Sequence, residues 1–248
     1  MDEPGGRRRF LKSAAALGAA MPAAAHAQQH AHGAAKGEKY MFLSPAEAAF
    51  LDAAVARLIP ADALGPGAKE AGVTYFIDQQ LFGGFGTMAK MYRQGPHGEG
   101  TPQQGYQSPL TPQEVYRAAI AEINVACVKQ HGRAFDKLES AKQDETLKAL
   151  DEGKFPLEAV PARFFFNMLL DNTVEGFFSD PIYGGNRDKI GWKLVGFPGV
   201  AAAYTQHVEK HGVPYDALPV SIVDVLEGKS TLDETGHPKH ILLVRKEG

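Results

Sequence analysis

Four charged side chains with types suited to acid–base chemistry lie close together in the chain. Glu175, Asp180, Arg187 and Asp188 fall within one short stretch. Carboxylates can exchange protons with a substrate when a pocket holds the substrate beside them. Nothing in the sequence places a substrate there. A plainer interpretation is that these groups hold a turn, because Asp180 precedes Pro181 and Arg187 can pair with Asp180 or Asp188.

A second candidate site is a pair of histidines. His207 and His211 would lie one turn apart if they are on a helix, a spacing that can hold a metal ion. The zinc-protease pattern requires a glutamate directly after the first histidine, and Val208 is there instead. No third ligand is evident, so we interpret the pair as part of an exposed polar face.

The cysteine content limits redox chemistry. Cys127 is the only cysteine, so the chain has no intrachain disulfide, no covalent haem motif and no iron–sulfur ligand set. Cys127 falls on an apolar helical stripe, which favours a buried small residue over a reactive thiol. No nucleotide-binding glycine motif and no Gly-x-Ser-x-Gly is present. We therefore assign no catalytic, cofactor-binding or metal-binding residue to this chain.

The acid–base candidates lie beside a glycine-rich, aromatic segment, residues 182–199. Large amphipathic side chains beside an arginine are typical of protein recognition surfaces, and glycines let a backbone lie close to another chain. We predict a partner-binding surface here, made of Tyr183, Gly184, Gly185, Asn186, Arg187, Asp188 and Trp192. The alternative is an ordered loop that packs its aromatic side chains on its own domain.

Residues 92–110 form another glycine- and proline-rich segment, with little periodicity. Long loops inside compact domains are usually functional or disordered. Tyr92 and Tyr106 favour an extended arm that lies on another surface, and we add both to the predicted partner interface. A disordered loop remains the alternative.

Helical signals dominate the rest of the chain. Ser44-Pro-Ala-Glu47 and Thr111-Pro-Gln-Glu114 are capping boxes with proline at the first helical position. Apolar spacing and stop signals predict helices at about 44–60, 73–81, 111–131, 144–151, 161–178 and 201–211. Two short apolar runs, at 221–226 and 240–245, fit either a small hairpin or two extended tails.

These patterns predict a mainly α fold. We expect a compact helical domain with long Gly/Pro-rich loops and a short extended C-terminal segment. The length of 248 residues suits one domain with extensions. The 26 basic and 29 acidic residues nearly balance, which argues against a nucleic-acid binder.

The N-terminus has the form of a twin-arginine export signal. Arg7, Arg8, Phe10 and Leu11 carry the motif, an alanine-rich stretch follows, and Ala25 and Ala27 frame a cleavage site. The alternative, a membrane anchor, would need a longer and more apolar stretch. We thus divide the chain into a signal peptide (1–27), a flexible linker (28–41), a helical domain (42–218) and a C-terminal extension (219–248).

The export route and the composition disagree in an informative way. The twin-arginine route carries proteins that are already folded and is used when a cofactor must be inserted first, yet this chain has no cofactor motif. We infer that the folded cargo is a partner that is exported on this signal.

Two runs of residues in the central stretch add to this interpretation. Two runs, Glu175-Gly-Phe-Phe-Ser-Asp-Pro-Ile-Tyr-Gly-Gly-Asn-Arg-Asp188 and Gly191-Trp-Lys-Leu-Val-Gly-Phe-Pro-Gly199, resemble the gluconate 2-dehydrogenase subunit 3 family. A weaker likeness extends from Phe42 to about Tyr204, which is most of the mature chain.

The resemblance implies the non-catalytic small subunit of a periplasmic dehydrogenase complex. It implies a large FAD-containing partner subunit that oxidises a sugar or sugar acid and, in many such complexes, a multihaem cytochrome c subunit that passes electrons to membrane quinones. The small subunit would assist folding and export of the flavoprotein and would touch the membrane only through its partners. A free-standing periplasmic enzyme or binding protein is the alternative.

Overall fold

The computed structural model describes residues 40–98, 100–200, 207–215, 217–232 and 238–239. The predicted export signal, with Arg7, Arg8, Phe10, Leu11 and the cleavage-site alanines Ala25 and Ala27, lies outside the described residues, so this prediction is untested. The same holds for the apolar run at 240–245 and for the start of the helix predicted at 201–211.

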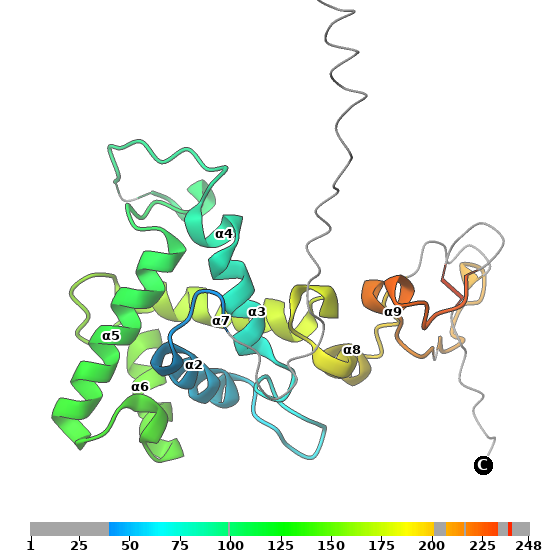
Figure 1. Ribbon diagram of the computed structural model, residues 1–248, viewed down its shortest axis with the longest axis horizontal. Helices are drawn as coiled ribbons and strands as arrows, with labels where there is room; N and C mark the ends of the chain where they lie inside the picture. The colour runs from blue at the N-terminus through cyan, green and yellow to red at the C-terminus, as the bar shows by residue number, and fades with distance from the viewer. Residues whose placement is uncertain (1–39, 99, 201–206, 216, 233–237, 240–248) are drawn as a thin grey trace, which may run out of the picture. The chain divides into compact units, whose positions relative to one another are not determined.

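The described part is mainly helical, which confirms the predicted fold class (Figure 1). Its α-helices are α2 (Pro45–Leu58), α3 (Val73–Phe82), α4 (Gly84–Thr87), α5 (Pro112–His131), α6 (Ser140–Asp151), α7 (Ala162–Phe178), α8 (Ile190–Val195) and α9 (Ile222–Leu226). Short 3-10 helices lie between them: η1 (Pro102–Gln104), η2 (Phe135–Lys137), η3 (Pro181–Tyr183) and η4 (Arg187–Lys189).

Both capping boxes form as predicted. The Glu47 side chain accepts a hydrogen bond from the backbone N–H of Ser44, and the Ser44 hydroxyl accepts one from Glu47. Thr111 and Glu114 repeat this exchange at the start of α5. Each box satisfies amide groups that the first helical turn would otherwise leave unpaired, so these two starts could be read from the sequence.

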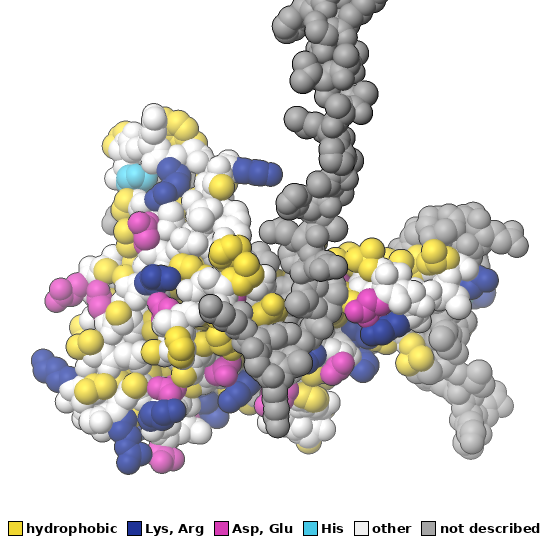
Figure 2. Space-filling view, viewed as in Figure 1, with side chains coloured by type: hydrophobic (Ala, Val, Ile, Leu, Met, Phe, Trp, Pro, Cys, Tyr) yellow, Lys and Arg dark blue, Asp and Glu magenta, His cyan; other side chains and the backbone are white. Residues whose placement is uncertain are grey.

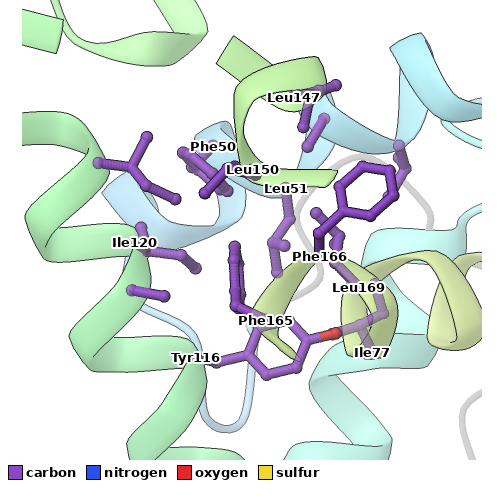
Figure 3. Close-up of a cluster of buried hydrophobic side chains, with 14 of the residues drawn as sticks. Phe50, Leu51, Ile77, Tyr116, Ile120, Leu147, Leu150, Phe165, Phe166 and Leu169 are labelled. Atoms are coloured by element: carbon purple, nitrogen blue, oxygen red, sulfur yellow. The ribbon is translucent and has the colours of Figure 1, made fainter. Parts of the chain in front are cut away.

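The core lies where α2, α3, α5, α6 and α7 meet. Figure 3 shows their apolar side chains pointing toward one another, with Phe165 of α7 near the centre. Phe165 packs edge-on against the buried ring of Tyr116, with the centroids 5.5 Å apart. Phe165, Leu169 and Asn172, which recur at helical spacing, are all buried, so one face of α7 packs into the core. This helix is therefore the base on which the following loop is built.

A buried carboxylate fastens the start of the described chain to α3. Asp78 is fully buried, and its two oxygens accept hydrogen bonds from the backbone N–H groups of Met41, Phe42 and Leu43 at 2.8 to 2.9 Å. A buried charge is tolerated only with such partners. The last residue of the predicted linker, Met41, is thus bound to the domain.

Two predicted elements differ in the structure. The run from Ser221 to Leu226, expected to be extended, is the short helix α9. Its capping box pairs Ser221 with Asp224, a signal present in the sequence that the apolar residues between them obscured. In the stretch 207–211, expected to end an α-helix, residue 207 has a 3-10 helical conformation and irregular chain with turns follows it.

Candidate functional site

The predicted recognition loop begins with a proline turn. The Asp180 side chain accepts a hydrogen bond from Ile182 N–H at 3.0 Å and so caps η3, with Pro181 at its first position. Gly184 ends η3 with a φ of 93°, a left-handed conformation that favours glycine. The second oxygen of Asp180 accepts from Ile222 N–H at 2.8 Å, which ties α9 to this turn.

The glycines of this loop lie against the chain's own helices. A Cβ built on Gly185 would lie 2.2 Å from the carbonyl oxygen of Gly176 in α7. A Cβ on Gly184 would lie 2.7 Å from the ring of Tyr75 in α3. We expected Gly184 and Gly185 to let the backbone approach another chain. That explanation is wrong, because the close approach is internal.

Two of the predicted interface residues are buried inside the chain. Asn186 is fully buried, donates to the Ser179 carbonyl at 2.8 Å and accepts from Gly191 N–H at 2.8 Å. Trp192 is only 5% exposed, and its indole N–H donates to the Phe178 carbonyl at 2.7 Å. Neither side chain can reach a partner from this position, so both correct the prediction and act as internal supports of the loop.

The backbone between these supports is strained. Asn186, Asp188 and Lys189 have φ values of 46°, 56° and 58°, in the left-handed region that side chains disfavour. Each such residue costs roughly 1 kcal/mol or more. Strain of this kind persists where the surroundings fix it, and it is common at functional sites. Here the buried Asn186 and the Lys189–Asp224 ion pair, at 2.6 Å, are the fixing contacts.

Arg187 has no partner for its charge among the described residues. Its backbone N–H donates to the Ala71 carbonyl at 2.9 Å, which fixes the start of the side chain. Its Nε atom is buried without a hydrogen-bond partner among the described residues, and no described carboxylate lies within 4.0 Å of the guanidinium. The expected pairing with Asp180 or Asp188 is therefore wrong. Asp180 is occupied by backbone groups, and Asp188 is exposed.

The surface of this loop consists of fewer residues than predicted. Tyr183 is 51% exposed, Asp188 is exposed and Arg187 is half-buried. Arg187 and Asp188 line a polar hollow of about 160 Å³ between the loop and α9. Besides Arg187 and Asp188, its charged lining residues are Lys189, Asp224, Glu227 and Lys229.

Asp224 joins the two sides of this hollow. Burial opposes its ionisation, but hydrogen bonds from Lys189 and from the backbone and hydroxyl of Ser221 outweigh burial and hold its pKa below the ordinary value. The Ser221 bonds cap the start of α9, and the Lys189 bond holds α9 against the 3-10 turns of the loop.

The acid–base set considered from sequence is not brought together. No hydrogen bond or ion pair joins Glu175 to Asp180, Arg187 or Asp188 in the described residues. Partial burial, followed by repulsion from Asp171, raises the pKa of the Glu175 carboxyl, but this group lies on α7 rather than in the hollow.

The second predicted interface segment is only partly surface. Tyr92 is 84% exposed. Tyr106 packs its ring on Phe164, with centroids 5.4 Å apart, and donates to the Leu110 carbonyl at 2.6 Å. Its burial raises the pKa of the phenol. Arg93 donates to the Pro109 carbonyl at 2.7 Å and closes the ends of the segment. Tyr106 therefore anchors the loop to this chain.

The remaining chemical candidates lie apart from the loop. Cys127 is buried, which raises the pKa of its thiol, in line with the inert role that we predicted. His207 packs edge-on against Tyr215. In the described residues, no three histidine, cysteine or carboxylate side chains are placed to hold a metal ion.

A family model decides which proteins this chain is related to. The model of gluconate 2-dehydrogenase subunit 3 matches residues 45–199. The chain belongs to this family. No curated protein and no solved structure matches the chain. In this subunit 3 chain the matched region begins at α2 and ends at Gly199, so it contains both glycine-rich segments.

Two surface features of this subunit 3 chain had no sequence signal that we used. One is α9 with its Ser221–Asp224 capping box. The other is an apolar hollow of about 460 Å³ between residues 58–66 and α8, into which the exposed Leu64 and Leu194 project. Charged side chains of both signs are interspersed over α2, α5 and α6 (Figure 2). None of the described helices is long and apolar enough to span a membrane.

Proposed function

We propose that this chain is the non-catalytic small subunit of a periplasmic, FAD-dependent dehydrogenase complex that oxidises a sugar or sugar acid. The observation that carries the proposal is the match to gluconate 2-dehydrogenase subunit 3 over residues 45–199. In this proposal FAD is bound by a separate large subunit, and a multihaem cytochrome c subunit is a third partner.

The second part of the proposal concerns export. The twin-arginine motif at Arg7 and Arg8 suits transport of a folded cargo. A small subunit that binds the folded flavoprotein in the cytoplasm would carry it across on this one signal. The subunit thus assists folding and export of its partner and then stabilises the complex in the periplasm.

The third part concerns the contact surface. A binding site is most precise when its exposed groups stand on a rigid support. The loop after α7 has such a support in Asn186, Trp192 and the glycine contacts with α3 and α7. The exposed Tyr183 and Asp188 and the half-buried Arg187 are the groups that it presents, and we propose that they contact the flavoprotein.

Co-expression with a candidate FAD-dependent dehydrogenase subunit from the same organism tests the proposal. We expect the two chains to copurify with stoichiometric flavin absorbance, and the mature small subunit alone to show neither flavin absorbance nor dehydrogenase activity with an artificial electron acceptor. Changing Arg7 and Arg8 to Lys should leave both chains in the cytoplasm.

Three results would contradict parts of the proposal. Flavin bound by the small subunit alone would show that it is not the accessory chain. A monodisperse small subunit that captures no flavoprotein would favour the free-standing alternative. A flavoprotein that reaches the periplasm at normal levels beside the Arg7→Lys, Arg8→Lys variant would refute the shared signal.

A further inference from the structure

The hollow beside Arg187 is lined by charges of both signs, and one of its cations has no ion-pair partner among the described residues. Six charged side chains line it, and four of them are already paired: Lys189 with Asp224, and Lys229 with Glu227. The remaining two are Arg187 and Asp188. Since Asp188 is exposed and forms no ion pair with a described residue, Arg187 is the one cation of the lining whose charge is unmatched there.

The guanidinium of Arg187 is held in position, but its buried Nε–H has no hydrogen-bond acceptor among the described residues. A Cβ built on Gly72 would lie 3.1 Å from Nη2 of Arg187, so the fork lies over this glycine, whose own φ is 76°. The backbone bond to Ala71 and the left-handed residues on both sides fix where the side chain starts. Its buried Nε–H has lost its water and gained no acceptor among the described residues. A donor in this state costs free energy until an acceptor arrives.

None of the nearby carboxylates pairs with the guanidinium in the described residues: Glu227 is bound to Lys229, and the exposed Asp188 forms no ion pair. Asp180 accepts from two backbone N–H groups, and Asp224 accepts from Lys189 and Ser221. Breaking either set would release α9 from the loop. The missing acceptor must therefore come from outside this part of the chain.

The shape of the donor selects the chemistry of the acceptor. A guanidinium presents its N–H groups in a planar fork that fits the two oxygens of a carboxylate. The hollow, at about 160 Å³, has room for a carboxylate group and its methylene stem. The two ion pairs around it leave Arg187 and the exposed Asp188, so the hollow offers an incoming anion a single positive charge beside a carboxylate, which suits a monoanion better than a phosphate.

We propose that the Arg187 hollow is a carboxylate-binding site, and that an Asp or Glu side chain of the catalytic subunit occupies it in the complex. The source of this carboxylate rests on the proposed function. Tyr183, 51% exposed on the same loop but outside the lining of the hollow, would be a neighbouring contact of the same partner.

Binding measurements on three variants of Arg187 test the proposal. Arg187→Ala should raise the Kd for the flavoprotein subunit about 30-fold, as is common for a binding hot spot. Arg187→Lys keeps the charge but loses the fork and should recover only part of the affinity, and Arg187→Gln should resemble Ala. The melting temperature of each should stay within about 2 °C of the parent, because no internal side-chain hydrogen bond is lost.

Arg133→Ala is the matched control. Arg133 is an exposed arginine after α5 without an ion pair among the described residues, so its loss should leave Kd unchanged. A second control separates the two sources of carboxylate. Acetate added to the isolated subunit should shift the Nε–Hε NMR signal of Arg187 only weakly and without saturation, because a free carboxylate lacks the contacts of a docked chain.

The outcomes of these binding measurements distinguish the carboxylate site from the proposed function and from a structural role of Arg187. If the parent chain binds the flavoprotein and Arg187→Ala binds equally well, the carboxylate site is wrong while the proposed function stands. If the parent binds no flavoprotein, the proposed function itself fails. Saturable acetate binding with an unchanged Kd for the partner assigns the site to a free carboxylate and overturns the protein source. Affinity lost in step with melting temperature in all three variants assigns Arg187 a structural role instead.

Discussion

The segments 183–192 and 92–110 share a composition rich in glycine with tyrosine, yet the chain uses them differently. In the first, backbone atoms of Gly185 lie directly on α7, and Asn186 and Trp192 are buried. In the second, Gly98 has open space around it, and Tyr92 is 84% exposed. Glycine thus packs closely against a helix in the first loop and stands in open space in the second.

The difference arises from what lies beneath each loop. The first loop follows α7 directly and returns over α3 and α7, so Gly185 and Gly191 lie against the backbone of α7 and Gly184 lies against the ring of Tyr75 in α3. The second has its ends joined by the hydrogen bond from Arg93 to the Pro109 carbonyl. It contacts the helices chiefly through Tyr106, whose ring packs on Phe164 of α7. Exposure of a glycine-rich loop therefore cannot be judged from its composition.

The largest difference in stability between the two loops is expected when one methyl group is added to a glycine of each. Gly185→Ala places a Cβ 2.2 Å from a backbone carbonyl that cannot move aside, and should destabilise the domain by about 3 kcal/mol or more. That corresponds to a melting temperature roughly 6–12 °C lower. Gly98→Ala meets no atom within 4 Å and should change stability by less than about 0.5 kcal/mol. Equal effects in calorimetry would show that the first loop is not packed as described.

A medium effect is expected from the contact between the first loop and α9, and it depends on pH. The folded pKa of Asp224 is lowered, so its contribution to stability is present above the unfolded pKa of about 3.9 and is lost as pH falls through the folded value. Asp224→Asn should therefore loosen α9 at pH 7, with faster hydrogen exchange at residues 221–229.

The pH comparison is the check on this second prediction. Parent and Asp224→Asn should differ most at neutral pH and converge in acid, because protonation removes from the parent what the substitution removes from the variant. Asp144→Asn, which removes a carboxylate paired with Arg57 far along the chain, is the control and should leave exchange at 221–229 unaltered. A difference that persists unchanged in acid would rule out the role given to the Lys189–Asp224 pair.

The smallest effect is expected at the tip of the second loop. Tyr92 donates to the neighbouring Gln94 side chain at 3.3 Å and is otherwise exposed. Tyr92→Ala should therefore change the free energy of unfolding by less than about 0.5 kcal/mol in urea titrations. A clear loss of stability would mean that this segment packs on the domain as the first loop does. Affinity for the flavoprotein, measured with the same variant, shows whether the exposed ring is a contact.

Local signals in the sequence determined most of the helical framework. Ser44–Glu47 and Thr111–Glu114 specify helix starts within a few residues, and the apolar spacing around Phe165 specifies which face of α7 is buried. These features are readable because the interacting groups are three or four residues apart. Local patterns failed where they were ambiguous, as in the run that forms α9, whose apolar residues suit a strand as well as a short helix.

The tertiary structure alone decided which loop residues face outward. The sequence identified the stretch around Arg187 and its family resemblance, but it placed Asn186 and Trp192 at the surface and gave Arg187 an ion pair that it lacks. Their surroundings come from residues far away in the chain: Ala71 and Gly72 below Arg187, and Ile222 on Asp180. Burial and pairing are properties of such long-range contacts, and no pattern within the loop itself encodes them.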